Sequence, residues 1–188
     1  MRPRRGTAFG LLIALALSLG YPPGAARAAG ERILVTNTRE GTLTVISRDT
    51  HEVIKTLPAG RKPNRLALAP GGRRAYIISD GRKFVRIFDT RELRFTGRIR
   101  AGRDPYNIAF APDGKLAYFV NTYSDNVSIV DLKAGKITGL IRHGGSNPVN
   151  IKVSPDGKLA YIANELSEDV TVVDLRTRKP VATIDAGH

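Results

Sequence analysis

Tyr118-Phe119-Val120-Asn121 is the stretch of sequence that decides the fold, because it returns at a nearly fixed interval. Related stretches begin at Leu34, Tyr76 and Tyr161, in steps of 42, 42 and 43 residues. A proline, a glycine and an acidic residue keep the same interval: Pro63, Pro105 and Pro148; Gly60, Gly102, Gly145 and Gly187; and Asp89, Asp131 and Asp174, with Ser47 in the first copy. A period of ~40–45 residues is typical of β-propeller blades, which consist of several short strands.

Each repeat divides into short apolar runs that turn residues separate. In the third repeat the runs cover 107–111, 117–121, 127–130 and 137–141, and Pro112-Asp113-Gly114 marks the first turn. In the third run of every copy the first and third positions are apolar, and the second is polar, becoming Arg86 once. This alternation places one face of each blade against its neighbour. We therefore predict an all-β propeller of four-stranded antiparallel blades.

The repeats resemble the YVTN β-propeller repeat family. Val35-Thr36-Asn37, Tyr118-Phe119-Val120-Asn121 and Tyr161-Ile162-Ala163-Asn164 are similar to its Tyr-Val-Thr-Asn signature, and the stretches 126–131 and 154–157 are also typical of it. The resemblance covers residues 33–188, although the second repeat has Ser79-Asp80-Gly81 where an asparagine is expected. It implies a propeller fold but no particular activity, since the repeat residues are structural.

The repeats, at about 33–74, 75–116, 117–159 and 160–188, supply one strand fewer than four full blades, so we expect an unfinished ring. In propellers of this kind the strand that ends in Pro-Asp-Gly is the innermost of its blade, and the first blade, 33–60, has only the outer three strands. Three explanations stay open: a fragment of a longer protein, a short chain that self-associates to complete the propeller, or a small four-bladed ring. An open stack leaves an apolar blade face at each end.

Residues 1–28 are expected to be a secretory signal peptide. Arg2, Arg4 and Arg5 precede an apolar stretch at 9–19, and Ala26-Arg27-Ala28 offers a cleavage site, with an uncleaved anchor as the alternative. We expect a periplasmic or cell-surface protein with no transmembrane span after cleavage.

Cleavage would lower the formal charge from +13 to +9, an excess that favours polyanions or reflects a solvated basic surface. The absence of cysteine excludes disulfides and thiolate metal sites.

The candidate site lies on the rim where the loops before the innermost strands meet the loops after the signature strands. This rim gathers cations in the first two repeats and carboxylates in the fourth, so we expect an anionic ligand there. The predicted ligand-binding residues are Arg61, Lys62, Arg82, Lys83, Arg103 and Tyr106. The alternative is a set of solvated loop tips.

Other chemical signals are weaker. His51, His143 and His188 occupy different repeat positions, so we interpret them as loop histidines and predict no metal site. Asp89, Asp131 and Asp174 each end a strand, where a carboxylate accepts local backbone hydrogen bonds. No nucleophile elbow or phosphate-binding loop is present, so we predict no catalytic residues and no cofactor.

Three functions follow from these observations. We expect an exported, non-enzymatic binding or scaffold protein that presents its loop rim to a protein partner or an anionic ligand. The first alternative is a cofactor- or metal-linked enzyme, since related propellers include lactone hydrolases and the haem-binding propeller of nitrite reductases. Its metal ligands would come from Asp104, Asp125, Asn147 and Glu165. The second alternative is nucleic-acid binding by the basic rim, although stacking aromatics are sparse there.

Overall fold

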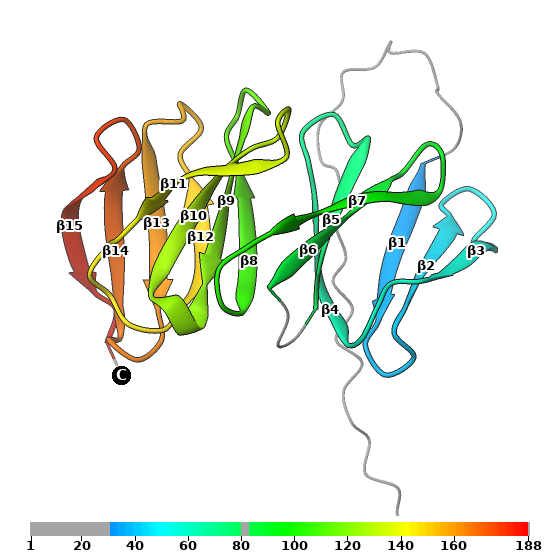
Figure 1. Cartoon of the computed structure of the whole chain (residues 1–188), viewed down its shortest axis with the longest axis horizontal. Helices are drawn as coiled ribbons and strands as arrows, with labels where there is room; N and C mark the ends of the chain where they lie inside the picture. The colour runs from blue at the N-terminus through cyan, green and yellow to red at the C-terminus, as the bar shows by residue number, and fades with distance from the viewer. Residues whose placement is uncertain (1–30, 80–82, 188) are drawn as a thin grey trace, which may run out of the picture.

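The computed structural model describes residues 31–79 and 83–187. The signal peptide expected at 1–28 lies outside the described residues, as do Arg82 and His188. Within the described residues, all strands belong to four antiparallel sheets that stand side by side (Figure 1). No helix in this part of the chain is long and apolar enough to cross a membrane. The predicted all-β fold, a partial β-propeller, is confirmed.

We call the sheets blades 1 to 4 in chain order. Blade 1 consists of β1 (Arg32–Asn37), β2 (Thr42–Ser47) and β3 (Val53–Pro58). Blade 2 consists of β4 (Pro63–Leu68), β5 (Arg74–Ser79), β6 (Phe84–Asp89) and β7 (Arg94–Arg100). Blade 3 consists of β8 (Pro105–Phe110), β9 (Leu116–Asn121), β10 (Asn126–Asp131) and β11 (Lys136–Ile141), with the short 3-10 helix η1 (Thr122–Ser124) after β9. Blade 4 consists of β12 (Pro148–Val153), β13 (Leu159–Asn164), β14 (Asp169–Asp174) and β15 (Lys179–Asp185).

The strands of each blade pair in chain order, and blade 1 has three strands among the described residues, as the sequence predicts. The innermost strands β4, β8 and β12 contact one another in sequence, and β1 contacts β4. The four blades therefore fan around one side of a common axis, with each innermost strand nearest to that axis.

The hydrophobic core lies between successive blades. Each of three clusters of buried side chains combines residues of one blade with residues of the next. Between blades 2 and 3, for example, the Tyr76 ring lies 5.4 Å from that of Phe110 and 6.4 Å from that of Phe119. Burial of a large apolar side chain contributes about 1.5–3 kcal/mol, so the interfaces between blades hold the stack together.

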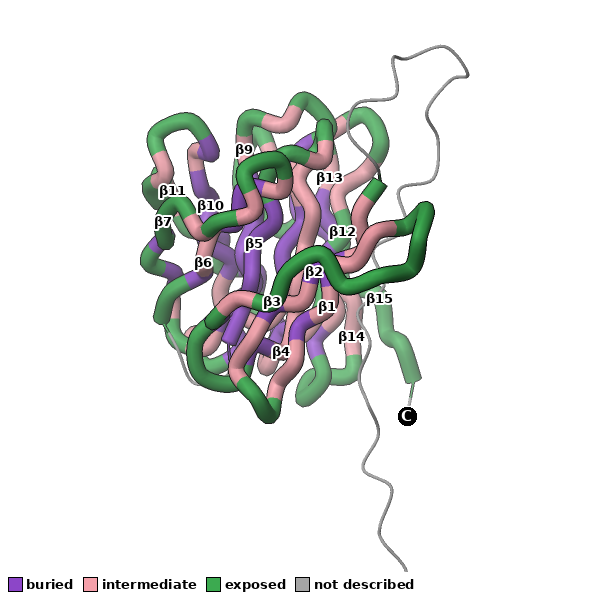
Figure 2. The backbone as a smooth tube through the Cα atoms, turned by 90° about the vertical axis from the view of Figure 1, so that its right-hand side faces the viewer, coloured by how far each residue is buried: buried purple, intermediate pink, exposed green. Residues whose placement is uncertain are grey.

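The tyrosine of the signature stretch shows which blade faces are covered. Tyr76 is 0% exposed and Tyr118 4%, because the next blade packs over each of them. Tyr161 occupies the same position in blade 4 and is 40% exposed. Figure 2 shows β15, the outermost strand of the same blade, exposed along its length. Blade 4 thus carries the residue of an interior interface on a face that no described blade covers.

An asparagine ends the signature strand in blades 1, 3 and 4; it is buried in blades 3 and 4 and half-buried in blade 1. Its side-chain nitrogen donates hydrogen bonds to the side chains five and seven residues further on, which lie at the start of the next strand. The acceptors are Thr42 (2.9 Å) and Thr44 (2.8 Å) for Asn37, Asn126 (2.9 Å) and Ser128 (2.8 Å) for Asn121, and Asp169 (2.6 Å) and Thr171 (2.9 Å) for Asn164. The polar second position of the third run is therefore an acceptor for the signature asparagine.

The recurrent glycines at 102 and 145 make room for this amide. A Cβ atom on Gly102 would lie 2.5 Å from the side chain of Asn121, and one on Gly145 would lie 2.0 Å from that of Asn164. The Gly102 N–H also donates to the Asn121 side-chain oxygen over 3.0 Å. The repeated glycine and the repeated asparagine are thus two parts of one packing arrangement.

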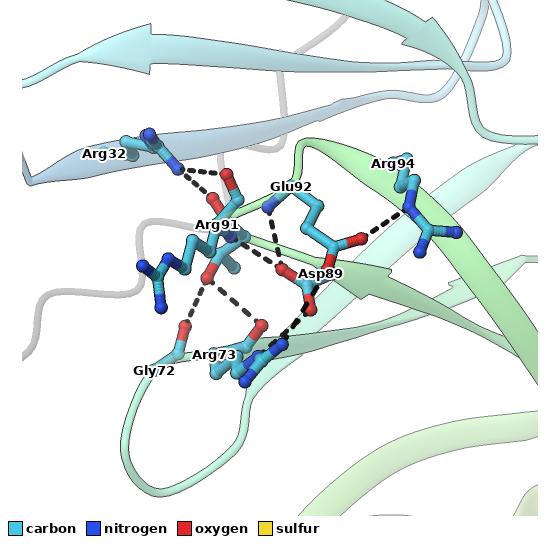
Figure 3. A network of polar contacts seen from close by, with 8 residues as sticks. Arg32, Gly72, Arg73, Asp89, Arg91, Glu92 and Arg94 are labelled. Atoms are coloured by element: carbon cyan, nitrogen blue, oxygen red, sulfur yellow. Dashed lines mark hydrogen bonds and ion pairs between the residues drawn. The ribbon is translucent and has the colours of Figure 1, made fainter. Parts of the chain in front are cut away.

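The acidic residue that ends the third strand of each full blade shapes the turn that follows it. In blade 2, Asp89 accepts hydrogen bonds from the N–H groups of Arg91 and Glu92, each over 2.9 Å (Figure 3). These donors, the Glu92 N–H first, hold the pKa of Asp89 below its usual range, although burial opposes them. Asp131, Asp174 and, in blade 1, Ser47 accept equivalent bonds. The predicted local role of these residues is confirmed.

We predict that Asn121→Ala lowers the free energy of unfolding by about 2–4 kcal/mol, because it leaves the Gly102 N–H and the buried Ser128 without their partner. Ser79→Ala, at the equivalent position of blade 2, should cost about 1 kcal/mol or less. Urea unfolding measures both changes as shifts of the midpoint at constant slope. Equal losses in the two variants would show that the amide network is not what stabilises blade 3.

Candidate functional site

Loops from all four blades meet at one end of the strands, which we call the loop rim. It comprises 38–41, 59–62, 83, 101–104, 122–125, 142–147 and 165–168, and it lies at the lower edge in Figure 1. The loops before the innermost strands bond to the loops after the signature strands: the Thr122 N–H donates to the Asp104 carbonyl (3.1 Å) and the Glu165 N–H to the Asn147 carbonyl (3.0 Å). The two kinds of loop thus share one face, as expected from the sequence.

The structure places the cations predicted for the site on this rim. Arg61, Lys62 and Arg103 are exposed in its loops. Lys83 is also exposed, and its carbonyl accepts a hydrogen bond from the Ala101 N–H over 2.7 Å, so it lies beside the loop that carries Arg103. Arg82 lies outside the described residues.

Tyr106 differs from the other predicted residues because it is already covered. It lies in β8, and the guanidinium carbon of Arg65, on β4, is 3.4 Å from the centre of its ring. This cation–π contact joins the innermost strands of blades 2 and 3. Beside it, the side-chain amide of Asn107 donates to the side-chain oxygen of Asn150 over 3.0 Å, which joins β8 to β12. Arg65, Asn107 and Asn150 thus form a polar row along the innermost strands, which sequence reasoning missed.

The carboxylates of blades 3 and 4 hold rim loops together. Asp125 accepts a hydrogen bond from the Asn147 N–H over 2.7 Å, and the Asn147 side-chain amide donates to Glu165 over 2.6 Å. These contacts bring together Asp125, Asn147 and Glu165, three of the four residues considered as metal ligands. Within residues 31–79 and 83–187, no three His, Asp or Glu side chains are grouped so that they could hold a metal ion.

A cavity of about 700 Å³ opens at the outer edge of the rim, between the β3–β4 loop and the outer strands of blade 2. Its described lining consists of Ala59, Gly60, Arg61, Ser79, Phe84, Arg86, Phe95, Thr96, Gly97 and Arg98. Among the described residues, Arg61 is the only predicted ligand-binding residue in this lining. The sequence did contain a signal for the cavity, since Ser79 and Arg86 are the points where the second repeat departs from the others.

His143 lies in a rim loop, as predicted, but it is buried. Only 2% of its surface is exposed, which its interpretation as a loop histidine did not indicate. Its Nδ1 atom accepts a hydrogen bond from the Gly145 N–H over 3.2 Å, and its Nε2 atom has no hydrogen-bond partner among the described residues. Burial lowers the pKa of His143, although the negative charges of Asp125 and Asp169 oppose that shift.

We predict that His143 makes the fold sensitive to mild acid. Because its folded pKa lies below the unfolded value of about 6.5, the unfolded chain binds the proton first, and stability falls as the pH drops below about 6.5. The loss is up to about 1.4 kcal/mol per pH unit. His143→Ala supplies the residue found at Ala59 and Ala101, and it should flatten this dependence between about pH 6.5 and 5. Denaturant unfolding across that range tests this, and parallel curves for both proteins would contradict it.

No family model and no curated protein matches the chain, so the resemblance to the YVTN family stays a prediction. Two solved structures are similar to it. Hydrazine synthase from Kuenenia stuttgartiensis matches with a TM-score of 0.74 and 19% identity, over 88% of this chain and 52% of that one. A functionally unknown protein from Desulfotomaculum acetoxidans matches with a TM-score of 0.73 and 16% identity, over 84% of this chain and 53% of that one. The chain thus spans about half the length of each, and at these identities the likeness shows the fold alone.

Proposed function

We propose that this chain is an exported, non-enzymatic propeller that binds an acidic segment of a protein partner on its loop rim. The observation that carries the proposal is the set of exposed rim cations Arg61, Lys62, Lys83 and Arg103. None of the ion pairs within the described residues includes any of them. Several cations of one sign on one face attract an anionic partner and raise its rate of association.

The opposite end of the molecule is arranged differently. There the turns pair several of their cations with carboxylates: Arg73 lies 3.2 Å from Asp89, Lys115 lies 3.8 Å from Asp113, and Lys158 lies 3.6 Å from Asp156. Such pairs lower the local potential, so the rim, whose cations form no ion pair within the described residues, is the better candidate for binding an anion.

Two further observations support binding and export. The rim carboxylates Asp125 and Glu165 are engaged in loop–loop hydrogen bonds, a structural use that leaves them poorly placed as an acid–base pair. Export is supported by the sequence of residues 1–28, in which arginines and then the apolar stretch 9–19 precede the cleavage site Ala26-Arg27-Ala28. Self-association is a second kind of partnership, and the exposure of Tyr161 on blade 4 favours it.

The proposal is tested with a fluorescein-labelled poly-glutamate peptide, whose binding is measured by anisotropy at low and physiological salt. Reversing the charges of Lys62, Lys83 and Arg103 to Glu should weaken binding about tenfold or more, since each exposed charge contributes about 0.5–1 kcal/mol. The affinity of the unmodified chain should also fall with added salt.

The matched control reverses Lys133, Lys136 and Arg176, three exposed cations in and beside the turns at the other end. It changes the net charge equally and should alter peptide binding less than threefold. Equal losses in the two triple variants would refute a rim site, because only net charge would then matter. Tighter binding of single-stranded DNA than of the peptide would instead favour the nucleic-acid alternative.

A further inference from the structure

We propose that the cavity between blades 1 and 2 binds a small organic oxyanion, a carboxylate or a phosphate ester. Its charged end contacts Arg61, Arg86 and Arg98, and its apolar part lies against Phe84. This site is separate from the exposed cations Lys62, Lys83 and Arg103, and it does not depend on a protein partner.

The first argument is that blade 2 departs from its own repeat at three positions that meet in this cavity. Where blade 3 has Asn121, Asn126 and Ser128, blade 2 has Ser79, Phe84 and Arg86. The side chain of Phe84 has no polar atom, and the guanidinium of Arg86 has donors only. Neither side chain can therefore accept the hydrogen bonds that Asn126 and Ser128 accept in blade 3. The three changes therefore act together: they remove one hydrogen-bond network, and all three residues line the cavity.

The second argument is that two of the arginines are held in place before any ligand arrives. The guanidinium carbon of Arg86 lies 3.7 Å from the centre of the Phe95 ring, and its Nη1 atom donates to the Pro58 carbonyl over 3.0 Å. Arg98 stacks on Phe84, 4.5 Å from the ring centre. Stacking uses the flat face of a guanidinium and leaves donors on its edge free for an oxyanion. Because the side chains are pre-ordered, less entropy is lost on binding.

The third argument is the charge of the cavity. Its described lining holds three arginines and no carboxylate. By contrast, a cavity of about 570 Å³ between blades 3 and 4 is lined by Asp113, Asp156 and Asp174 beside Lys158 and Arg176. Burial lowers the pKa of Arg86, so its charge is desolvated, and the described lining supplies no anion to compensate it. A bound oxyanion would supply that compensation.

The fourth argument is size and polarity. A cavity of about 700 Å³ is in the range of small-molecule sites and is much larger than an inorganic ion requires. Phe84 remains 37% exposed and Phe95 also lines the space, so apolar surface adjoins the charged groups. This combination suits an organic anion better than a bare phosphate.

The test uses the full chain and three probes: phenyl phosphate, benzoate and the neutral benzamide. NMR titration should show phenyl phosphate or benzoate shifting the amide signals of Gly60 and Gly97, with benzamide at least tenfold weaker. The stronger of the two anions identifies the source of the oxyanion. Equal binding of benzamide, or of inorganic phosphate and phenyl phosphate, would overturn the proposal.

The decisive variant is Ser79→Asn/Phe84→Asn/Arg86→Ser, which gives blade 2 the residues of blade 3. It should abolish anion binding while keeping the fold, because the network it installs already exists in three blades. Should this variant fail to fold, Arg98→Gln is compared with Arg100→Gln, an exposed arginine of the same strand outside the lining. Arg98→Gln should weaken phenyl phosphate binding about fivefold or more, and Arg100→Gln less than twofold. Equal effects would overturn the proposal.

The rim variant keeps the two proposals apart. Charge reversal of Lys62, Lys83 and Arg103 should change phenyl phosphate binding less than threefold. Loss of phenyl phosphate binding in that variant, with normal binding in the blade 2 variant, would assign the anion to the rim and refute the cavity site.

Discussion

The hydrogen bonds of the signature asparagine are the interaction on which each regular blade depends. A buried amide needs partners, and the sequence supplies them at fixed distances along the chain: five and seven residues ahead, and in blade 3 a backbone N–H nineteen residues behind. This requirement explains why an asparagine, a glycine and a polar strand residue recur with one period. The apolar positions between them are then free to pack against the next blade, which is where the stability of the stack lies.

Blade 2 shows what happens when that interaction is given up. Its backbone keeps the four-stranded form, because the apolar positions on both faces are retained and fully buried at Tyr76, Ile77 and Phe88. The guanidinium of Arg86, however, donates to the Pro58 carbonyl and stacks on the Phe95 ring instead of joining an asparagine network. The fold therefore tolerates a change of chemistry at the polar positions, and this is how a repeat protein can acquire a distinct feature in one blade.

The sequence predicts most of the fold, since strand positions, blade boundaries and turn residues all follow from local patterns with a fixed period. It predicts less of the site. The exposed cations Arg61, Lys62, Lys83 and Arg103 lie where loop topology places them, but Tyr106 is covered by Arg65, a contact between strands about forty residues apart. His143 occupies the position of Ala59 and Ala101, which are buried as well, but the additional residue before Pro148 shifts the spacing and hides that correspondence in the sequence. The departures at Ser79 and Arg86 were visible, yet linking them to Arg98 requires the register of β6 and β7.

The graded exposure of the signature tyrosines has a spectroscopic consequence. The chain contains no tryptophan, so tyrosine dominates its ultraviolet fluorescence. Tyr76 and Tyr118 are sealed between blades, whereas Tyr161 occupies the same repeat position with an open face. A dissolved quencher therefore reaches the ring of Tyr161 but not those of Tyr76 and Tyr118. Any molecule that covers blade 4 shields Tyr161 from the quencher, and the intrinsic emission of the protein reports that event without an attached label.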